Sequence, residues 1–210
     1  MNRLLLCGIA AACIYILTDI TAAASYPGFS YSDQAVSELF ATGAPTSKFV
    51  VPLFSLSSTL LLIFGLAIFS LSQGRKALRV TGVMFVASAL DALLLWNLFP
   101  MHMRGETQTY VDTMHLILAA NPFVLAALVA SILAFRGSFR AASIAVLAIV
   151  LALAAFGFHY APAIAAGQAT PGLGASERAA QYIYQMWQIG LAIILLRREK
   201  PSLTMVAAGN

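Results

Sequence analysis

Two histidines and an aspartate gather in one short stretch of the chain. His102 and Asp112 lie between two apolar runs, His115 lies at the start of the second run, and Asp112 precedes His115 by three residues. On a helix that spacing places both side chains on one face. Two imidazoles and a carboxylate could bind zinc and leave a position open for water. A membrane-embedded, metal-dependent hydrolase, with Glu38 or His115 as its catalytic acid–base group, is therefore one function that the sequence allows.

Few other features point to catalysis. The chain has no HxxxH or HExxH pair, no glycine-rich phosphate loop, no dinucleotide fingerprint and no CxxC. Ser37 lacks the flanking glycines of a nucleophile elbow, which disfavours a serine hydrolase. Histidines at the ends of helices often bond only to loop backbone. The sequence leaves open whether the protein is an enzyme. The expected cofactor is none, with a divalent metal such as zinc as the alternative.

Further polar side chains lie in or beside the apolar runs, mostly in the half of each run that is predicted to lie on the extracytoplasmic side. Polar groups inside a membrane usually have a partner or a function. We expect a ligand-binding pocket lined by Ser37, Glu38, Asp91, His115, Asn121, Gln185 and Gln188. Interhelical hydrogen bonding, worth about 0.6 kcal/mol per contact, is the alternative explanation. Asp19 and Asp91 lie in predicted spans, and no Lys or Arg lies within any of these spans to neutralise them. These two carboxyl groups therefore leave a third function open, that of a small transporter or proton-coupled carrier.

The elements that carry these residues are long apolar runs. Hydrophobic residues make up 60% of the chain and charged residues 10%, whereas soluble domains carry about 25% charged residues. Runs of about 18 or more apolar residues favour membrane-spanning helices over the alternating strands of a β-barrel. The sequence predicts an all-α, six-helix transmembrane bundle within one domain, residues 1–200. The expected spans are 4–24, 49–71, 80–99, 113–135, 141–160 and 179–196.

The positive charges predict an orientation. Most of the 12 Lys and Arg residues fall at the two termini and in the two short loops on the same side. The positive-inside rule then places both termini in the cytoplasm of a bacterium, with the bundle in its inner membrane. These clusters are not a basic patch, so we expect no nucleic-acid partner. Arg3, the apolar core 4–17 and Ala22–Ala24 also fit a cleaved signal peptide, which stays an alternative for the first span.

The first extracytoplasmic loop contains a short helical pattern. Residues 32–42 should form an interfacial helix that turns Val36, Leu39 and Phe40 toward the bundle. Glu38 would then lie on the other side of this helix, where it could face water. Residues 161–178, rich in Pro and Gly, should be irregular. Residues 201–210 should form a disordered cytoplasmic tail.

Short motifs follow one another in the predicted extracytoplasmic segments. They are Tyr26-Pro27-Gly28-Phe29-Ser30, Val36-Ser37-Glu38-Leu39 with Gly43, Phe99-Pro100, Thr113-x-His115, and Gly172-Leu173 with Glu177-Arg178. In their order and spacing, over nearly the whole chain, these motifs resemble a bacterial membrane family, the domain of unknown function DUF998. The resemblance implies a six-helix membrane protein, no settled activity, and special positions at Ser37, Glu38 and His115. Met101-His102 stands where the family pattern often has an acidic residue.

These observations favour a binding protein. We expect it to hold a lipid head group or small amphiphile in an extracytoplasmic-facing polar pocket, with membrane lipids as its partners. The ligand and the oligomeric state do not follow from the sequence.

Overall fold

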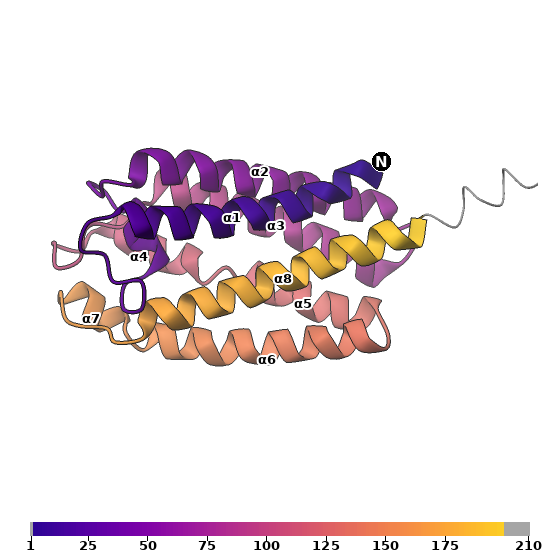
Figure 1. Cartoon of the computed structure of the whole chain (residues 1–210). Coiled ribbons are helices and arrows are strands. Elements are labelled where there is room, and N and C mark those ends of the chain that lie inside the picture. Colours follow the sequence, from indigo (N-terminus) through magenta and orange to yellow (C-terminus); the bar gives the residue numbers. More distant parts are fainter. Residues whose placement is uncertain (1, 200–210) are drawn as a thin grey trace, which may run out of the picture.

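The chain folds into a bundle of long apolar helices (Figure 1). The computed structural model describes residues 2–199, whose regular structure is entirely helical. Six segments of this part are long and apolar enough to cross a membrane, which confirms the predicted all-α, six-span bundle. The spans are built from α1 (Leu6–Ser25), α2 (Ser47–Leu71), α3 (Lys76–Leu98), α4 (Tyr110–Ala119) with α5 (Pro122–Ala134), α6 (Ser138–Phe158) and α8 (Leu173–Glu199). The predicted tail, residues 201–210, lies outside the described residues.

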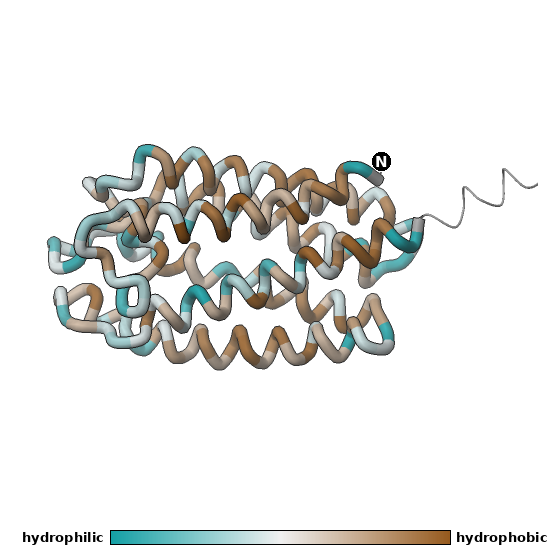
Figure 2. Tube along the Cα trace, in the orientation of Figure 1, coloured by the Kyte–Doolittle hydropathy of each residue, from teal (hydrophilic) through white to brown (hydrophobic). Residues whose placement is uncertain are grey.

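The six spans form a closed ring. α1 packs against α2, α2 against α3, α3 against α5, α5 against α6, α6 against α8, and α8 against α1. Segments 26–46, 99–109 and 159–172 connect the helices at one end, which we call the long-loop end; it lies at the left of Figure 1. The start of α1 and the end of α8 lie together at the opposite, short-loop end. Figure 2 shows hydrophobic residues along most helices and hydrophilic residues in the long loops and along the first half of α8.

Aromatic side chains fill the interior toward the long-loop end. The ring of Tyr15 stacks on that of Phe54, with centroids 4.7 Å apart. Trp96 lies 4.9 Å from Phe54 and 5.0 Å from Phe40, measured between ring centroids. Phe40 belongs to the 3₁₀-helix η2 (Val36–Phe40), so this cluster holds the first long loop onto the bundle. Val36, Leu39 and Phe40 are all buried, as the sequence predicted.

Several expected boundaries were wrong. The interfacial helix covers only Val36–Phe40 instead of 32–42. The segment 161–178 contains a short helix, α7 (Ala161–Ala165), and the first turn and a half of α8, which starts at Leu173 rather than near 179. An early start is stable because the first turn finds partners outside the helix: the Ala175 N–H donates to the Ser32 carbonyl over 2.8 Å.

Two glycines let α2 and α3 approach closely. A Cβ atom at Gly82 would lie 2.6 Å from the backbone nitrogen of Phe69 and 2.8 Å from the carbonyl oxygen of Gly65. A Cβ atom at Gly65 would lie 2.8 Å from the backbone nitrogen of Val86. Backbone atoms of a packed helix cannot move aside cheaply. Small residues at this crossing are therefore a requirement of the fold.

We expect Gly82→Ala to destabilise the protein by about 1–3 kcal/mol, the usual cost of overpacking. Thermal unfolding in detergent, followed by circular dichroism, measures the change. Gly190→Ala is the matched control, because its Cβ would meet only Phe139, at an ordinary 3.7 Å, and alanine favours helix over glycine. Equal unfolding midpoints for the two variants would contradict the close packing of α2 on α3.

Candidate functional site

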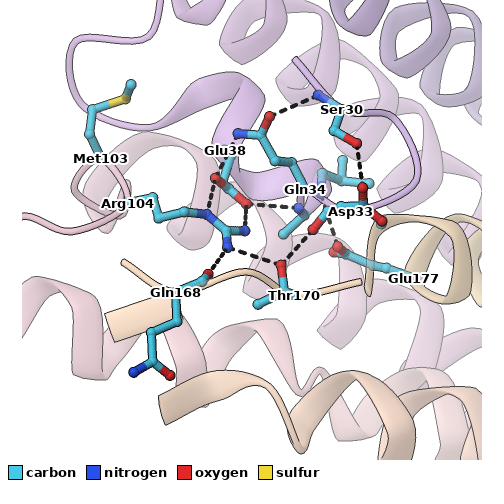
Figure 3. Close-up of polar contacts among 12 residues, drawn as sticks. Ser30, Asp33, Gln34, Glu38, Met103, Arg104, Gln168, Thr170 and Glu177 are labelled. Carbon is cyan, nitrogen blue, oxygen red and sulfur yellow. Dashed lines mark hydrogen bonds and ion pairs between the residues drawn. The ribbon is translucent and has the colours of Figure 1, made fainter. Parts of the chain in front are cut away.

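A buried ion pair organises the long-loop end. Glu38 is 3% exposed, and its two carboxylate oxygens accept hydrogen bonds from Arg104 Nη2 and Nε over 2.6 and 3.0 Å. The Ala35 N–H and Gln34 Nε2 donate to the same carboxylate (Figure 3). Two parallel bonds between a guanidinium and a carboxylate are a strong, geometrically defined contact. Glu38 therefore does not face water, and its carboxylate is occupied by protein donors rather than free for a ligand.

Arg104 extends this contact to the third long loop. Its Nη1 donates to the Gln168 carbonyl over 2.7 Å and to the Thr170 hydroxyl over 2.9 Å. Thr170 in turn donates to the Asp33 carbonyl over 2.6 Å (Figure 3). Glu38, Arg104, Thr170 and Asp33, which we call the loop network, thus tie all three long loops together.

The carboxylate of Asp33 also accepts two hydrogen bonds. The Gly172 N–H donates to its carboxylate over 2.9 Å, and the Ser30 hydroxyl donates over 2.8 Å. These bonds, the one from Gly172 above all, lower the pKa of the Asp33 carboxyl below its ordinary value. The carboxylate form is therefore the one that holds the start of α8 to the first loop.

A second buried ion pair joins the first and last spans. Asp19 is fully buried and Arg178 is 2% exposed, and Arg178 Nε donates to the Asp19 carboxylate over 3.0 Å. The Tyr182 hydroxyl donates to the same oxygen over 2.5 Å. The expected last span, 179–196, left Arg178 outside it, and this boundary was wrong because α8 begins at Leu173. The carrier hypothesis assumed that no Lys or Arg lies within a span, and for Asp19 this assumption does not hold, because Arg178 lies in α8 and bonds to it.

The expected metal ligands make other contacts. Asp112 accepts bonds from the His102 N–H and His102 Nδ1, both over 2.8 Å, and from the N–H and hydroxyl of Thr109. The Thr109 bonds form the capping box that begins α4. His115 Nδ1 lies 2.7 Å from the Phe99 carbonyl. Within residues 2–199 no group of three or more His, Cys, Asp or Glu side chains is arranged to hold a metal ion. His102, Asp112 and His115 therefore do not form the metal site that the sequence predicted.

A cavity of about 210 Å³ lies among α4, α5, α6 and α8, next to η2. Its apolar wall includes Leu125 from α5 and Val150, Leu153 and Ala154 from α6. Its polar lining comes from five parts of the chain, which are the loop before α4, η2, α4, the junction of α4 with α5, and α8: Gln108, Ser37, Asp112, His115, Asn121, Glu177, Gln181 and Tyr184. The cavity is therefore amphipathic, with carboxylate, amide, imidazole and hydroxyl groups facing a hydrocarbon wall.

The fourth span is broken beside this cavity. The sequence predicted one helix over 113–135, but α4 ends at Ala119 and α5 begins at Pro122. Asn121 between them adopts the left-handed conformation, with φ +31°. Proline has no N–H to continue the helix and fits the first turn of a new one. Broken backbone inside a membrane is tolerated where it lines a cavity or is covered by protein. Ala119, Ala120 and Asn121 all line the cavity.

The predicted pocket is only partly the observed one. Ser37, His115 and Asn121 line the cavity as expected. Four other predicted residues do not: Glu38, Asp91, Gln185 and Gln188. Glu38 binds Arg104, and Gln188 donates to the Gly8 carbonyl of α1 over 2.7 Å. Asp91 and Gln185 are buried away from the cavity.

Three cavity residues on α8 were missed. Glu177, Gln181 and Tyr184 follow one another at i, i+4 and i+7, so they share one face of the helix. The spacing was visible in the sequence. The neighbouring face of the helix, with Gln185 and Gln188, has an equally regular polar pattern. Only the packing of the bundle decides which face contacts α1 and which lines the cavity.

Comparison with known proteins identifies a family. The model of the family "Protein of unknown function (DUF998)" matches residues 9–194. No curated protein and no solved structure shows significant similarity to the chain.

We expect Arg104→Met to destabilise the protein by about 3 kcal/mol, because it leaves the Glu38 carboxylate buried without its cation. Denaturant unfolding in detergent measures the loss. The double variant Glu38→Gln/Arg104→Met should lose less than the sum of the two single variants, since the removed groups are coupled. Lys48→Met, at an exposed cation of α2, is the control and should change little. Additive losses for Glu38 and Arg104 would contradict the coupling.

Proposed function

Since the chain belongs to DUF998, a family described only as of unknown function, we propose its function from the geometry: it binds a lipid head group or small amphiphile in the cavity. The observation that carries this proposal is the amphipathic lining. His115 and Tyr184, 3% and 4% exposed, face the same space as Leu125, Val150 and Leu153. A ligand with one polar and one apolar part would match both kinds of surface. Water could hydrogen-bond to the polar groups, but its contact with the apolar wall is unfavourable.

The size of the cavity limits what it can hold. Pockets for drug-sized ligands occupy about 300–1,000 Å³, and this cavity measures about 210 Å³. It suits a head group with the first carbons of its chain rather than a whole lipid. The remainder of an acyl chain would extend along the exposed side of α6, where Phe158 lines the rim and is 48% exposed.

The location of the bundle is part of this proposal. Six apolar spans make the chain a multi-pass membrane protein. Clusters of Lys and Arg at the short-loop end, including Arg75, Lys76, Arg197 and Arg198, favour a cytoplasmic position for that end in a bacterial inner membrane. The long-loop end with its cavity would then face the extracytoplasmic side, and membrane lipids would be the ligands within reach.

We expect Ala154→Trp to fill the cavity and abolish amphiphile binding. Native mass spectrometry of the protein, extracted from its membrane in mild detergent, would detect the bound molecule as an added mass that dissociates at higher collision energy. Wild-type protein should carry this mass and Ala154→Trp should lack it.

Ala152→Trp is the matched control. Ala152 lies two residues away on the same helix, is exposed, and does not line the cavity. It should retain the bound mass. Equal occupancy of the two tryptophan variants would overturn the proposed function, provided that both unfold at the wild-type temperature.

A further inference from the structure

The polar atoms that the cavity leaves without partners are mostly hydrogen-bond acceptors. Three side chains that line it each have one atom with no bonding partner among the described residues: His115 Nε2, Asn121 Oδ1 and the Tyr184 hydroxyl. Buried polar groups in proteins are nearly always hydrogen-bonded, so atoms left open at a cavity indicate what a ligand has to supply.

The His115 imidazole can be assigned. Its Nδ1 lies 2.7 Å from the Phe99 carbonyl oxygen, which can only accept, so Nδ1 carries the proton. In the neutral ring the other nitrogen, Nε2, then has a lone pair and accepts. The same reasoning applies to Asn121, whose Nδ2 donates to the Ser88 carbonyl and leaves Oδ1 as an acceptor. Tyr184 offers a hydroxyl, which both donates and accepts.

The charge of the lining agrees with this assignment. Its carboxylates are Asp112 and Glu177, and none of the described lining residues is Lys or Arg. The two nearby arginines are engaged elsewhere, Arg104 with Glu38 and Arg178 with Asp19. A phosphate or carboxylate presents only acceptors, and here it would meet lone pairs and carboxylates without a compensating cation.

We propose that the ligand is an amphiphile with an uncharged, hydroxyl-bearing head group, such as a glycerol or sugar, rather than an anionic lipid. This inference rests on the proposed function. Two hydroxyls of one head group can donate one each to His115 Nε2 and Asn121 Oδ1, and either can accept from the Tyr184 hydroxyl, which matches all three open atoms. An ammonium group could donate to all three, but it has no lone pair and would leave the proton of the Tyr184 hydroxyl without an acceptor.

Three probes with the same oleoyl chain test the proposal: 1-oleoylglycerol, methyl oleate, and 1-oleoylglycerol 3-phosphate. Their dissociation constants would be measured by native mass spectrometry on the full-length protein in detergent. 1-Oleoylglycerol should bind about 10-fold or more tightly than methyl oleate, because each hydrogen bond contributes about 0.5–1.5 kcal/mol. The phosphate should bind more weakly than 1-oleoylglycerol.

Two variants connect this preference to the open atoms. His115→Asn keeps a side-chain donor for the Phe99 carbonyl but removes the acceptor at Nε2, and Tyr184→Phe removes only the hydroxyl. Each should weaken 1-oleoylglycerol about 2–10-fold, the value of one hydrogen bond, and leave methyl oleate unchanged. Unfolding temperatures near wild type would exclude a folding defect.

The possible outcomes separate the two proposals. If all three probes bind equally well, or the phosphate binds best, while Ala154→Trp still abolishes binding, the cavity is a ligand site and the hydroxyl preference is overturned. If no probe binds, or Ala154→Trp binds as wild type does, the proposed function itself fails. A preference for 1-oleoylglycerol that both His115→Asn and Tyr184→Phe remove supports the inference.

Discussion

The buried ion pair of Asp19 and Arg178 is the constraint on which the arrangement of the long-loop end depends. A charged group inside a bilayer is costly unless another group neutralises it, and these two side chains are almost wholly enclosed. The guanidinium also donates to the carbonyls of Tyr31 and Gln34 and lies over the Tyr31 ring, 4.1 Å from its centroid. One arginine therefore fixes the first span, the last span and the loop after the first span relative to one another.

The engagement of both arginines shapes the cavity. Arg178 binds Asp19 and Arg104 binds Glu38, so neither arginine of the long-loop end lines the cavity. The space enclosed beneath those loops is left with imidazole, amide, hydroxyl and carboxylate groups. The polar groups available in the cavity thus depend on contacts outside it, because the two arginines neutralise the buried carboxylates of Asp19 and Glu38 instead.

The sequence predicts those features that a single segment determines. Apolar length gives the six spans, and the spacing of Val36, Leu39 and Phe40 gives the buried face of η2. Features that depend on partners far along the chain escaped prediction. The pairing of Asp19 with Arg178 needs two spans to meet, and the fate of Glu38 depends on Arg104 in another loop. For the same reason the sequence-based prediction included Ser37, His115 and Asn121, which line the cavity, but selected the wrong face of α8. The glutamines of α8 lie on two faces with similar polar patterns, and only the contact with α1 distinguishes them.

The closure of the ring between α1 and α8 bears on the biogenesis of the protein. Asp19 precedes its cationic partner by 159 residues, so the ribosome delivers the acid with the first span and the arginine only with the last. Throughout synthesis the first span lacks the group that neutralises its carboxyl. Its Asp19 end must meanwhile stay near the hydrated surface, and final docking has to wait until the last span has entered the bilayer.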